Sequence, residues 1–169
     1  MFRLALGLLS VGFAGSLVSM KRHLGCLVFL MKGHAGCGET VTRGQSPRNL
    51  AIGDSLLASN MQTGNSISRH LENLLNEPVL DRSDIGARVL YPLPLTGALG
   101  MNISRQYRPG NWDWIIVNGG GNDLWLGCGC LVCDQKLDRL ISPGGQEGEI
   151  ARHVADLRKT GANVIYVGY

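Results

Sequence analysis

The sequence has few charged residues and few cysteines, and each shortage excludes a class of protein. Charged residues make up 17% of the 169 positions, against about 25% in an average protein, so the chain is not a disordered polyelectrolyte. Five cysteines are too few for a scaffold built on disulfides. The 24 glycines follow no G-X-Y period, which excludes collagen. With 44% apolar residues and the length of one domain, the chain is expected to form a single loop-rich α/β domain.

Positive charge is concentrated in the first part of the chain. Residues 1–48 contain six Lys or Arg and one acidic residue, whereas residues 49–169 contain ten Lys or Arg and twelve Asp or Glu. A nucleic-acid-binding protein would carry its basic patch on the folded body, and no RNP, zinc-finger or basic-helix pattern occurs there. Nucleic acid is therefore not an expected partner.

The opening segment has the pattern of an export signal. Residues 4–20 carry no charge and follow Arg3, as the apolar region of a signal peptide does. Ala35–Cys37 resembles the end of a bacterial lipoprotein signal, so a lipid anchor on its cysteine is one alternative, and translation from Met20 is another. We predict that residues 1–37 are a signal peptide or membrane anchor and that only this leader contacts the membrane. The body would then be secreted or periplasmic.

Residues 38–48 are polar and lack periodicity, as a linker does, and residues 49–169 have the pattern of one α/β domain. Short apolar runs there alternate with amphipathic segments, which predicts a parallel sheet covered by helices. The predicted strands are residues 49–52, 78–80, 112–117 and 164–167, and the predicted helices are residues 66–76 and 149–159. The first helix is indicated by four apolar residues at helical spacing: Ile67, Leu71, Leu74 and Leu75.

The chain ends after the fourth predicted strand, with no helix to cover it. We therefore expect a three-layer, doubly wound and mostly parallel α/β/α fold that is incomplete at its C-terminus. Such a fold would expose an apolar edge at Val164, Ile165 and Val167.

Gly53-Asp54-Ser55-Leu56 directly follows the first predicted strand. Ser55 would thus lie at the carboxyl end of that strand, where open α/β sheets bind their ligands. The glycine permits a sharp turn, and the backbone N–H of a serine at the start of a helix can hold an oxyanion. The hydrolase elbow G-x-S-x-G does not fit, because Leu57 occupies its fifth position. Taken alone, the motif could also be a turn with a helix cap.

Glycine and asparagine follow the next two strands. Gly86 comes after the second strand, and Gly119-Gly120-Gly121-Asn122-Asp123 comes after the third. In order and spacing, Ser55, Gly86 and Asn122 resemble blocks of the SGNH, or GDSL, family of serine esterases and lipases. The resemblance implies a flavodoxin-like fold and hydrolysis of carboxylic esters without a cofactor. It makes Ser55 the nucleophile and makes the Gly86 N–H and the Asn122 amide its partners in an oxyanion hole.

The sequence departs from this family in its histidines. The family has a late Asp-x-x-His that supplies the general base, and the sequence contains no such motif. His23 and His34 belong to the predicted leader, and His70 and His153 are expected on helix surfaces. Two hypotheses follow: an esterase that forms an acyl-enzyme on Ser55, monomeric when full length, or a catalytically inactive fragment or pseudoenzyme that keeps the pocket.

Acidic residues and thiols surround the predicted site. Asp54 is expected to accept backbone N–H bonds after the first strand, and Asp123 is expected to anchor its own turn. Cys128, Cys130 and Cys133 lie close together in sequence. They could form a disulfide-stapled loop, provide three ligands of a Zn²⁺ site, or remain free thiols.

Overall fold

The computed structural model describes residues 46–126, 128 and 133–169. The predicted leader at residues 1–37 lies outside this range, as do most of the predicted linker and Cys130. Within the described part of the chain, no helix has the length and apolar character needed to cross a membrane.

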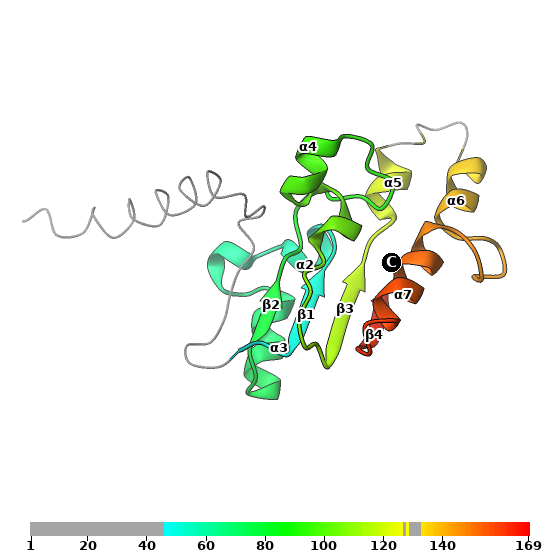
Figure 1. Cartoon of the computed structure of the whole chain (residues 1–169). Coiled ribbons are helices and arrows are strands. Elements are labelled where there is room, and N and C mark those ends of the chain that lie inside the picture. Colours follow the sequence, from blue (N-terminus) through cyan, green and yellow to red (C-terminus); the bar gives the residue numbers. More distant parts are fainter. Residues whose placement is uncertain (1–45, 127, 129–132) are drawn as a thin grey trace, which may run out of the picture. The chain divides into compact units, whose positions relative to one another are not determined.

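A single open parallel sheet organises the described domain (Figure 1). Its strands are β1 (Asn49–Ile52), β2 (Val79–Asp81), β3 (Trp114–Asn118) and β4 (Asn163–Val167). Their order is β2-β1-β3-β4, and every pair is parallel. This is the order of a flavodoxin-like sheet, so the predicted α/β fold is confirmed. The predicted strands agree with the observed ones to within two residues at each end.

Helices and helical turns connect the strands. The two predicted helices are present as α3 (Ile67–Leu75) and α7 (Glu149–Arg158). The remaining elements are α2 (Ser55–Ala58), η1 (Met61–Thr63), α4 (Pro94–Thr96), η2 (Gly97–Met101), η3 (Ile103–Gln106), α5 (Gly121–Trp125) and α6 (Asp134–Leu140). Between β2 and β3, where no helix was predicted, the chain forms the three short turns α4, η2 and η3, each of at most five residues.

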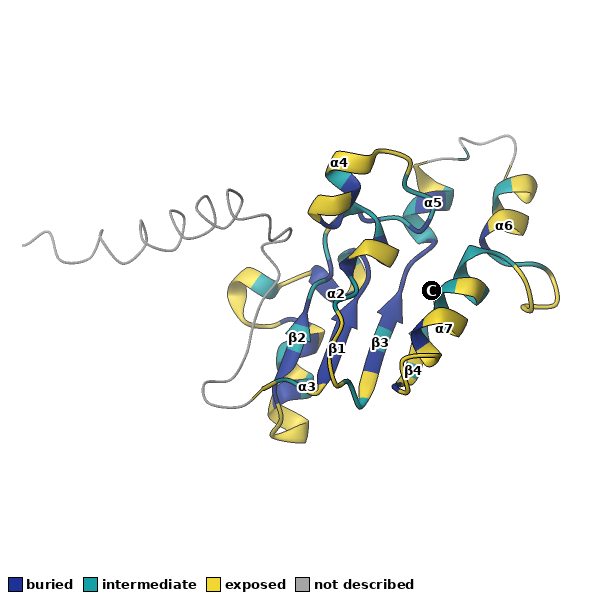
Figure 2. Ribbon diagram, in the orientation of Figure 1, coloured by how far each residue is buried: buried dark blue, intermediate teal, exposed yellow. Residues whose placement is uncertain are grey.

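The sheet lies between two layers of packed side chains, because neighbouring residues of a strand point to opposite faces. Leu50 and Ile115 face a core shared with Leu140 of α6 and Leu157 of α7. The intervening Ala51 faces the opposite side and contacts a second cluster: Leu57, Val79, Leu71 and Ile116. Figure 2 shows β1 as the most deeply buried strand. The three-layer arrangement is therefore confirmed.

Helix α3 buries a different face from the one that its apolar residues indicated. Leu74 is 82% exposed and Leu75 is 51% exposed, whereas the polar Ser68 and Glu72 are buried. Of the apolar stripe, Leu71 packs against the core. The helix begins at Ser66, whose hydroxyl accepts the Arg69 N–H at 3.2 Å.

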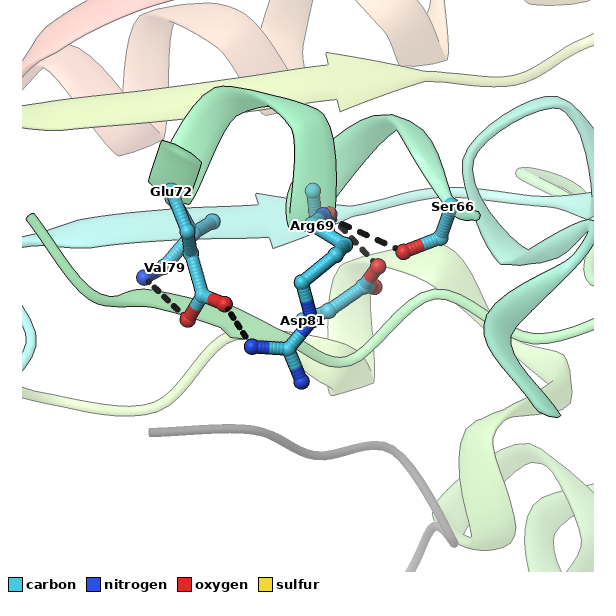
Figure 3. Close-up of polar contacts among 6 residues, drawn as sticks. Ser66, Arg69, Glu72, Val79 and Asp81 are labelled. Carbon is cyan, nitrogen blue, oxygen red and sulfur yellow. Dashed lines mark hydrogen bonds and ion pairs between the residues drawn. The ribbon is translucent and has the colours of Figure 1, made fainter. Parts of the chain in front are cut away.

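The buried face of α3 is held to β2 by polar contacts, drawn in Figure 3. Glu72 Oε1 accepts the Val79 N–H at 3.1 Å, and Glu72 Oε2 pairs with Arg69 at 2.5 Å. The Ser68 hydroxyl donates to Asp81 Oδ2 at 2.5 Å. These bonds satisfy the buried carboxylates, so a polar surface replaces an apolar one at this contact.

Strand β4 leaves part of its surface exposed, as the sequence predicted. Ile165 is 45% exposed, while Val164 and Val167 are half-buried. Val164 packs against the α7 core, because that helix covers its face of the sheet. The exposed part of the predicted apolar edge is therefore mainly Ile165.

Candidate active site at the carboxyl ends of β1 and β3

Ser55 is the first residue of α2 and lies three residues after the end of β1. Asp54 caps the helix: its Oδ1 accepts the Leu56 N–H at 3.1 Å, and its side chain is fully buried. Asp54 therefore has the role that the sequence predicted for it. Ser55 itself is half-buried, so an external molecule can reach it.

The position of Ser55 coincides with the switch point of the sheet. The chain leaves β1 toward β2 on one side, and β3 is followed by β4 on the other side. Ligands of open α/β sheets bind in the crevice formed where the connections diverge in this way. Ser55 follows β1 and Asn122 follows β3, so both residues lie at this end of the sheet.

Asn122 is joined directly to the loop of Gly86. Asn122 lies in α5, and its Nδ2 donates to the Ala87 carbonyl at 3.1 Å. Gly86 has a φ angle of 82°, a backbone conformation that residues other than glycine rarely adopt. Gly86 and Asn122 are half-buried like Ser55. The structure thus brings the second and third predicted site residues together, at the same end of the sheet as Ser55.

Asp123 holds the loop that follows β2, at Val89 and Leu90. Its two carboxylate oxygens accept the N–H groups of Val89 and Leu90 at 2.8 and 2.7 Å. Burial raises the pKa of Asp123, and these two hydrogen bonds partly oppose the shift. Asp123 was expected to anchor its own turn, and the structure shows it instead bonding the backbone of the loop after β2.

Two residues that sequence reasoning missed hold Asp54 in place. Asn118, the last residue of β3, accepts the Asp54 N–H at 3.0 Å and donates to Asp54 Oδ1 at 2.8 Å. The Tyr169 hydroxyl donates to the other oxygen of Asp54. Burial, followed by this hydrogen bond to Asp54, raises the pKa of Tyr169. Asn118 could have been noticed as an amide that ends an apolar strand, whereas nothing local in the sequence marks Tyr169.

Neither histidine of the described domain is bonded to Ser55. His70 is exposed on α3, as predicted. His153 differs from its prediction, because it is half-buried on α7 and its Nε2 is buried without a hydrogen-bond partner among the described residues. Burial lowers the pKa of His153. His70 is carried by α3, whose Leu71 packs in the same cluster as Leu57 of α2, and His153 is carried by α7, whose Leu157 belongs to the core on the other face of the sheet.

The two described cysteines of the thiol cluster flank the segment between α5 and α6. The Cys128 N–H donates to the Leu124 carbonyl at 3.0 Å, and Cys133 occupies the N-cap position of α6 without a side-chain capping bond. Both thiols are free, and a hydrogen bond between them raises the pKa of Cys133. Within the described residues, no group of three His, Cys, Asp or Glu could hold a metal ion. A disulfide stays a prediction.

A surface cavity of about 650 Å³ lies elsewhere in the described domain. It is lined mostly by charged and polar residues of α6, of the start of α7 and of the loop between them, including Asp138, Arg139, Glu149 and Arg152. Ser55, Gly86 and Asn122 are not among its lining residues. We therefore base the site on the sheet edge and its hydrogen bonds.

Fold and site together define an open parallel α/β protein with a serine, a glycine and an asparagine around its switch point. No family model and no curated protein matches the sequence. Two solved structures are similar to it. One is AlinE4, an esterase of the SGNH-hydrolase family, at 22% identity and a TM-score of 0.49. The other, from Slackia heliotrinireducens, has been proposed to be an SGNH hydrolase, at 21% identity and a TM-score of 0.39.

The similarity covers 74% of this chain and 60% of AlinE4, and 72% of this chain and 55% of the Slackia protein. The chain therefore spans less than two thirds of the length of either structure. The functional argument below rests on the residues of the site.

Proposed function

We propose that this chain is a serine hydrolase of the SGNH type that acts on carboxylic esters through an acyl-enzyme on Ser55. The observation that carries the proposal is the hydrogen bond from Asn122 to Ala87, beside Gly86, at the same end of the sheet as Ser55. An ester oxyanion needs several hydrogen-bond donors around it. The Asn122 amide and the N–H groups of Gly86 and Ser55 form such a set of donors at one end of the sheet.

In the proposed reaction, the Ser55 hydroxyl oxygen attacks the ester carbonyl carbon and loses its proton to a base. The carbonyl oxygen becomes an oxyanion, which accepts hydrogen bonds from the N–H groups of Ser55 and Gly86. Asn122 donates one N–H to Ala87, and its second N–H, which has no hydrogen-bond partner among the described residues, would join them. The alcohol then leaves with a proton, and water releases the acid from Ser55.

The proposed reaction needs a general base. Without a general base, a serine hydroxyl stays protonated and is a poor nucleophile at neutral pH. The sequence has no Asp-x-x-His, and this favours a second candidate function: a protein that binds an ester or related acyl ligand without cleaving it.

An assay with an added base separates the two functions. We expect the purified chain to hydrolyse a short p-nitrophenyl ester at the blank rate, and added imidazole to raise the rate above that of imidazole alone, because imidazole supplies the missing base. Ser55→Ala should abolish the gain. Ser104→Ala, at an exposed serine of η3, is the control and should retain it.

A chain that gains nothing from imidazole beyond the Ser55→Ala rate would contradict the hydrolase. Binding of a non-hydrolysable phosphonate ester by the same protein, measured by calorimetry, would then support the ligand-binding function.

We further propose that the protein acts outside the cytoplasm on small ester substrates and without nucleic acid, and that it is a monomer when full length. The export proposal rests on the uncharged run behind Arg3. Expression of the chain with a C-terminal tag, followed by N-terminal sequencing of exported protein, would locate any cleavage. Protein that stays in the cytoplasm with an intact N-terminus would contradict export.

A further inference from the structure

A single side chain, that of Gln106, forms hydrogen bonds with the backbone of Gly53, two positions before Ser55. Gln106, at the end of η3, accepts the Gly53 N–H on its Oε1 at 2.6 Å. Its Nε2 donates to the carbonyl of the same Gly53 at 2.8 Å. Both polar groups of one peptide residue are therefore bound by an amide that lies 53 positions away in sequence.

Gln106 makes a third hydrogen bond, which reaches the loop region of Gly86. Its Nε2 also donates to the Gly100 carbonyl at 2.8 Å. The neighbouring Met101 carbonyl accepts the Arg88 N–H at 2.9 Å, and a Cβ built on Gly86 would lie 3.5 Å from the Met101 methyl carbon. The segment that Gln106 holds is thus the segment against which the Gly86 loop rests.

The Gln106 side chain does not hydrogen-bond to bulk water, because the residue is only 1% exposed. A buried amide that lost its partners would cost free energy, so its orientation is fixed by these bonds. The Gly53 carbonyl also accepts the Asp84 N–H at 3.1 Å, which adds a second link between the turn after β1 and the loop after β2.

We propose that Gln106 is a positioning residue that sets the turn of Ser55 at a fixed place relative to the Gly86 loop. The nucleophile and one donor of the oxyanion hole come from different loops, and Gln106 is the side chain bonded to both supporting segments. This inference rests on the proposed hydrolase function. Its geometric part concerns the Gly53 backbone, and that part can be tested separately.

Three purified variants test the role. Gln106→Met keeps the approximate volume and removes every hydrogen bond, whereas Gln106→Glu keeps the acceptor for the Gly53 N–H. Gln135→Met makes the same chemical change at an exposed position of α6 and is the matched control. The first measurement is hydrogen exchange of the Gly53 amide by NMR. The second is the imidazole-supported, Ser55-dependent hydrolysis of a p-nitrophenyl ester, separated into kcat and KM.

We expect Gln106→Met to lose the protection of the Gly53 amide. It should also lower kcat by about 10- to 100-fold with little change in KM, because small misplacements of a nucleophile reduce the rate by such factors. Gln135→Met should change neither quantity. Gln106→Glu should come closest to the wild type at low pH, where a protonated carboxyl can both accept from the Gly53 N–H and donate to a carbonyl.

The two readouts fail in distinguishable ways. Full protection of Gly53 in Gln106→Met, with unchanged kcat, would overturn the positioning role. If the wild type shows no Ser55-dependent hydrolysis, the hydrolase function fails, and the exchange of Gly53 still decides whether Gln106 holds the turn. If Gln106→Met does not fold, the pH dependence of Gly53 protection in Gln106→Glu decides the same point, and protection that is the same at all pH values would contradict the proposal.

Discussion

At the scale of single residues, the proposed site depends on the two N–H groups of the Asn122 amide, one of which binds the protein backbone while the other is proposed to bind the substrate. One N–H is engaged by the Ala87 carbonyl at 3.1 Å, and this bond orients the whole amide. An amide held in this way can offer its other N–H without reorganisation when charge develops on a substrate oxygen. The same side chain therefore anchors the Gly86 loop, and in the proposed reaction it also donates to the oxyanion.

Asn122→Ala tests this division. We expect the imidazole-supported kcat for ester hydrolysis to fall by about 10²–10³, with little change in KM, because an oxyanion donor acts mainly in the transition state. Initial rates over a range of ester concentrations give both constants. A change confined to KM would assign Asn122 to substrate binding instead.

The residues that sequence reasoning missed share a physical cause. Gln106 and Tyr169 act on Gly53 and Asp54 from 53 and 115 positions away, so no local pattern around either residue indicates the contact. The positions of Ser55, Gly86 and Asn122 after strand ends could be predicted, because an apolar run marks each of the preceding strands. The residues that hold these turns in place depend on the tertiary fold.

At the scale of elements, the contact between α3 and β2 depends on buried carboxylates. Burial raises the pKa of Asp81 above its ordinary 3.8, although hydrogen bonds from Ser68 and Ser83 oppose the shift. The folded protein therefore binds this proton more tightly than the unfolded chain does. Protonated Asp81 therefore adds to the free energy of unfolding. This contribution is full below pH 3.8 and is lost as the pH rises through the folded-state pKa of Asp81.

Asp81→Asn removes this titration and keeps the acceptor for Ser83, which bonds Asp81 Oδ1 at 2.9 Å. We expect the melting temperature of Asp81→Asn, relative to the wild type, to rise as the pH is raised from below 3.8 toward neutrality. Thermal melts at several pH values measure the difference, and Asp138→Asn, at an exposed position, is the control. A difference that stays constant or falls with pH would contradict the account.

Helix α3 also shows where pattern reasoning fails for an element. Its existence and ends were predicted, because Ser66 caps its start and the apolar spacing is helical. Its buried face was not predicted correctly, because Glu72 is buried: it accepts a hydrogen bond from the Val79 N–H and forms an ion pair with Arg69. A polar residue can therefore take a core position when the neighbouring strand offers it partners.

At the scale of the whole molecule, the four-stranded sheet presents its site at one end and an apolar side chain at one edge. In the described part of the chain, β4 pairs only with β3, and Ile165 is 45% exposed. Exposed apolar edge strands promote association between sheets. The layers were predictable, because short apolar runs that alternate with amphipathic segments indicate a parallel sheet covered by helices. The flavodoxin-like strand order was implied by the family resemblance.

Ile165→Lys tests the consequence of this edge. We expect a larger monomeric fraction in size-exclusion chromatography, because a lysine on an edge strand opposes pairing with another sheet. The loss in the free energy of unfolding should not exceed about 1 kcal/mol, since nearly half of the side chain is already exposed to water. Equal elution profiles of variant and wild type at high protein concentration would show that the edge does not cause association.

The most direct test of the central claim is whether Ser55 becomes covalently modified. The purified chain would be incubated with a fluorophosphonate in the presence of imidazole, digested and mapped by mass spectrometry. The account predicts one phosphonylated residue, Ser55, with slower labelling in Asn122→Ala and none in Ser55→Ala. Labelling that is unchanged in Ser55→Ala, or that is found on Ser59 instead, would contradict the account.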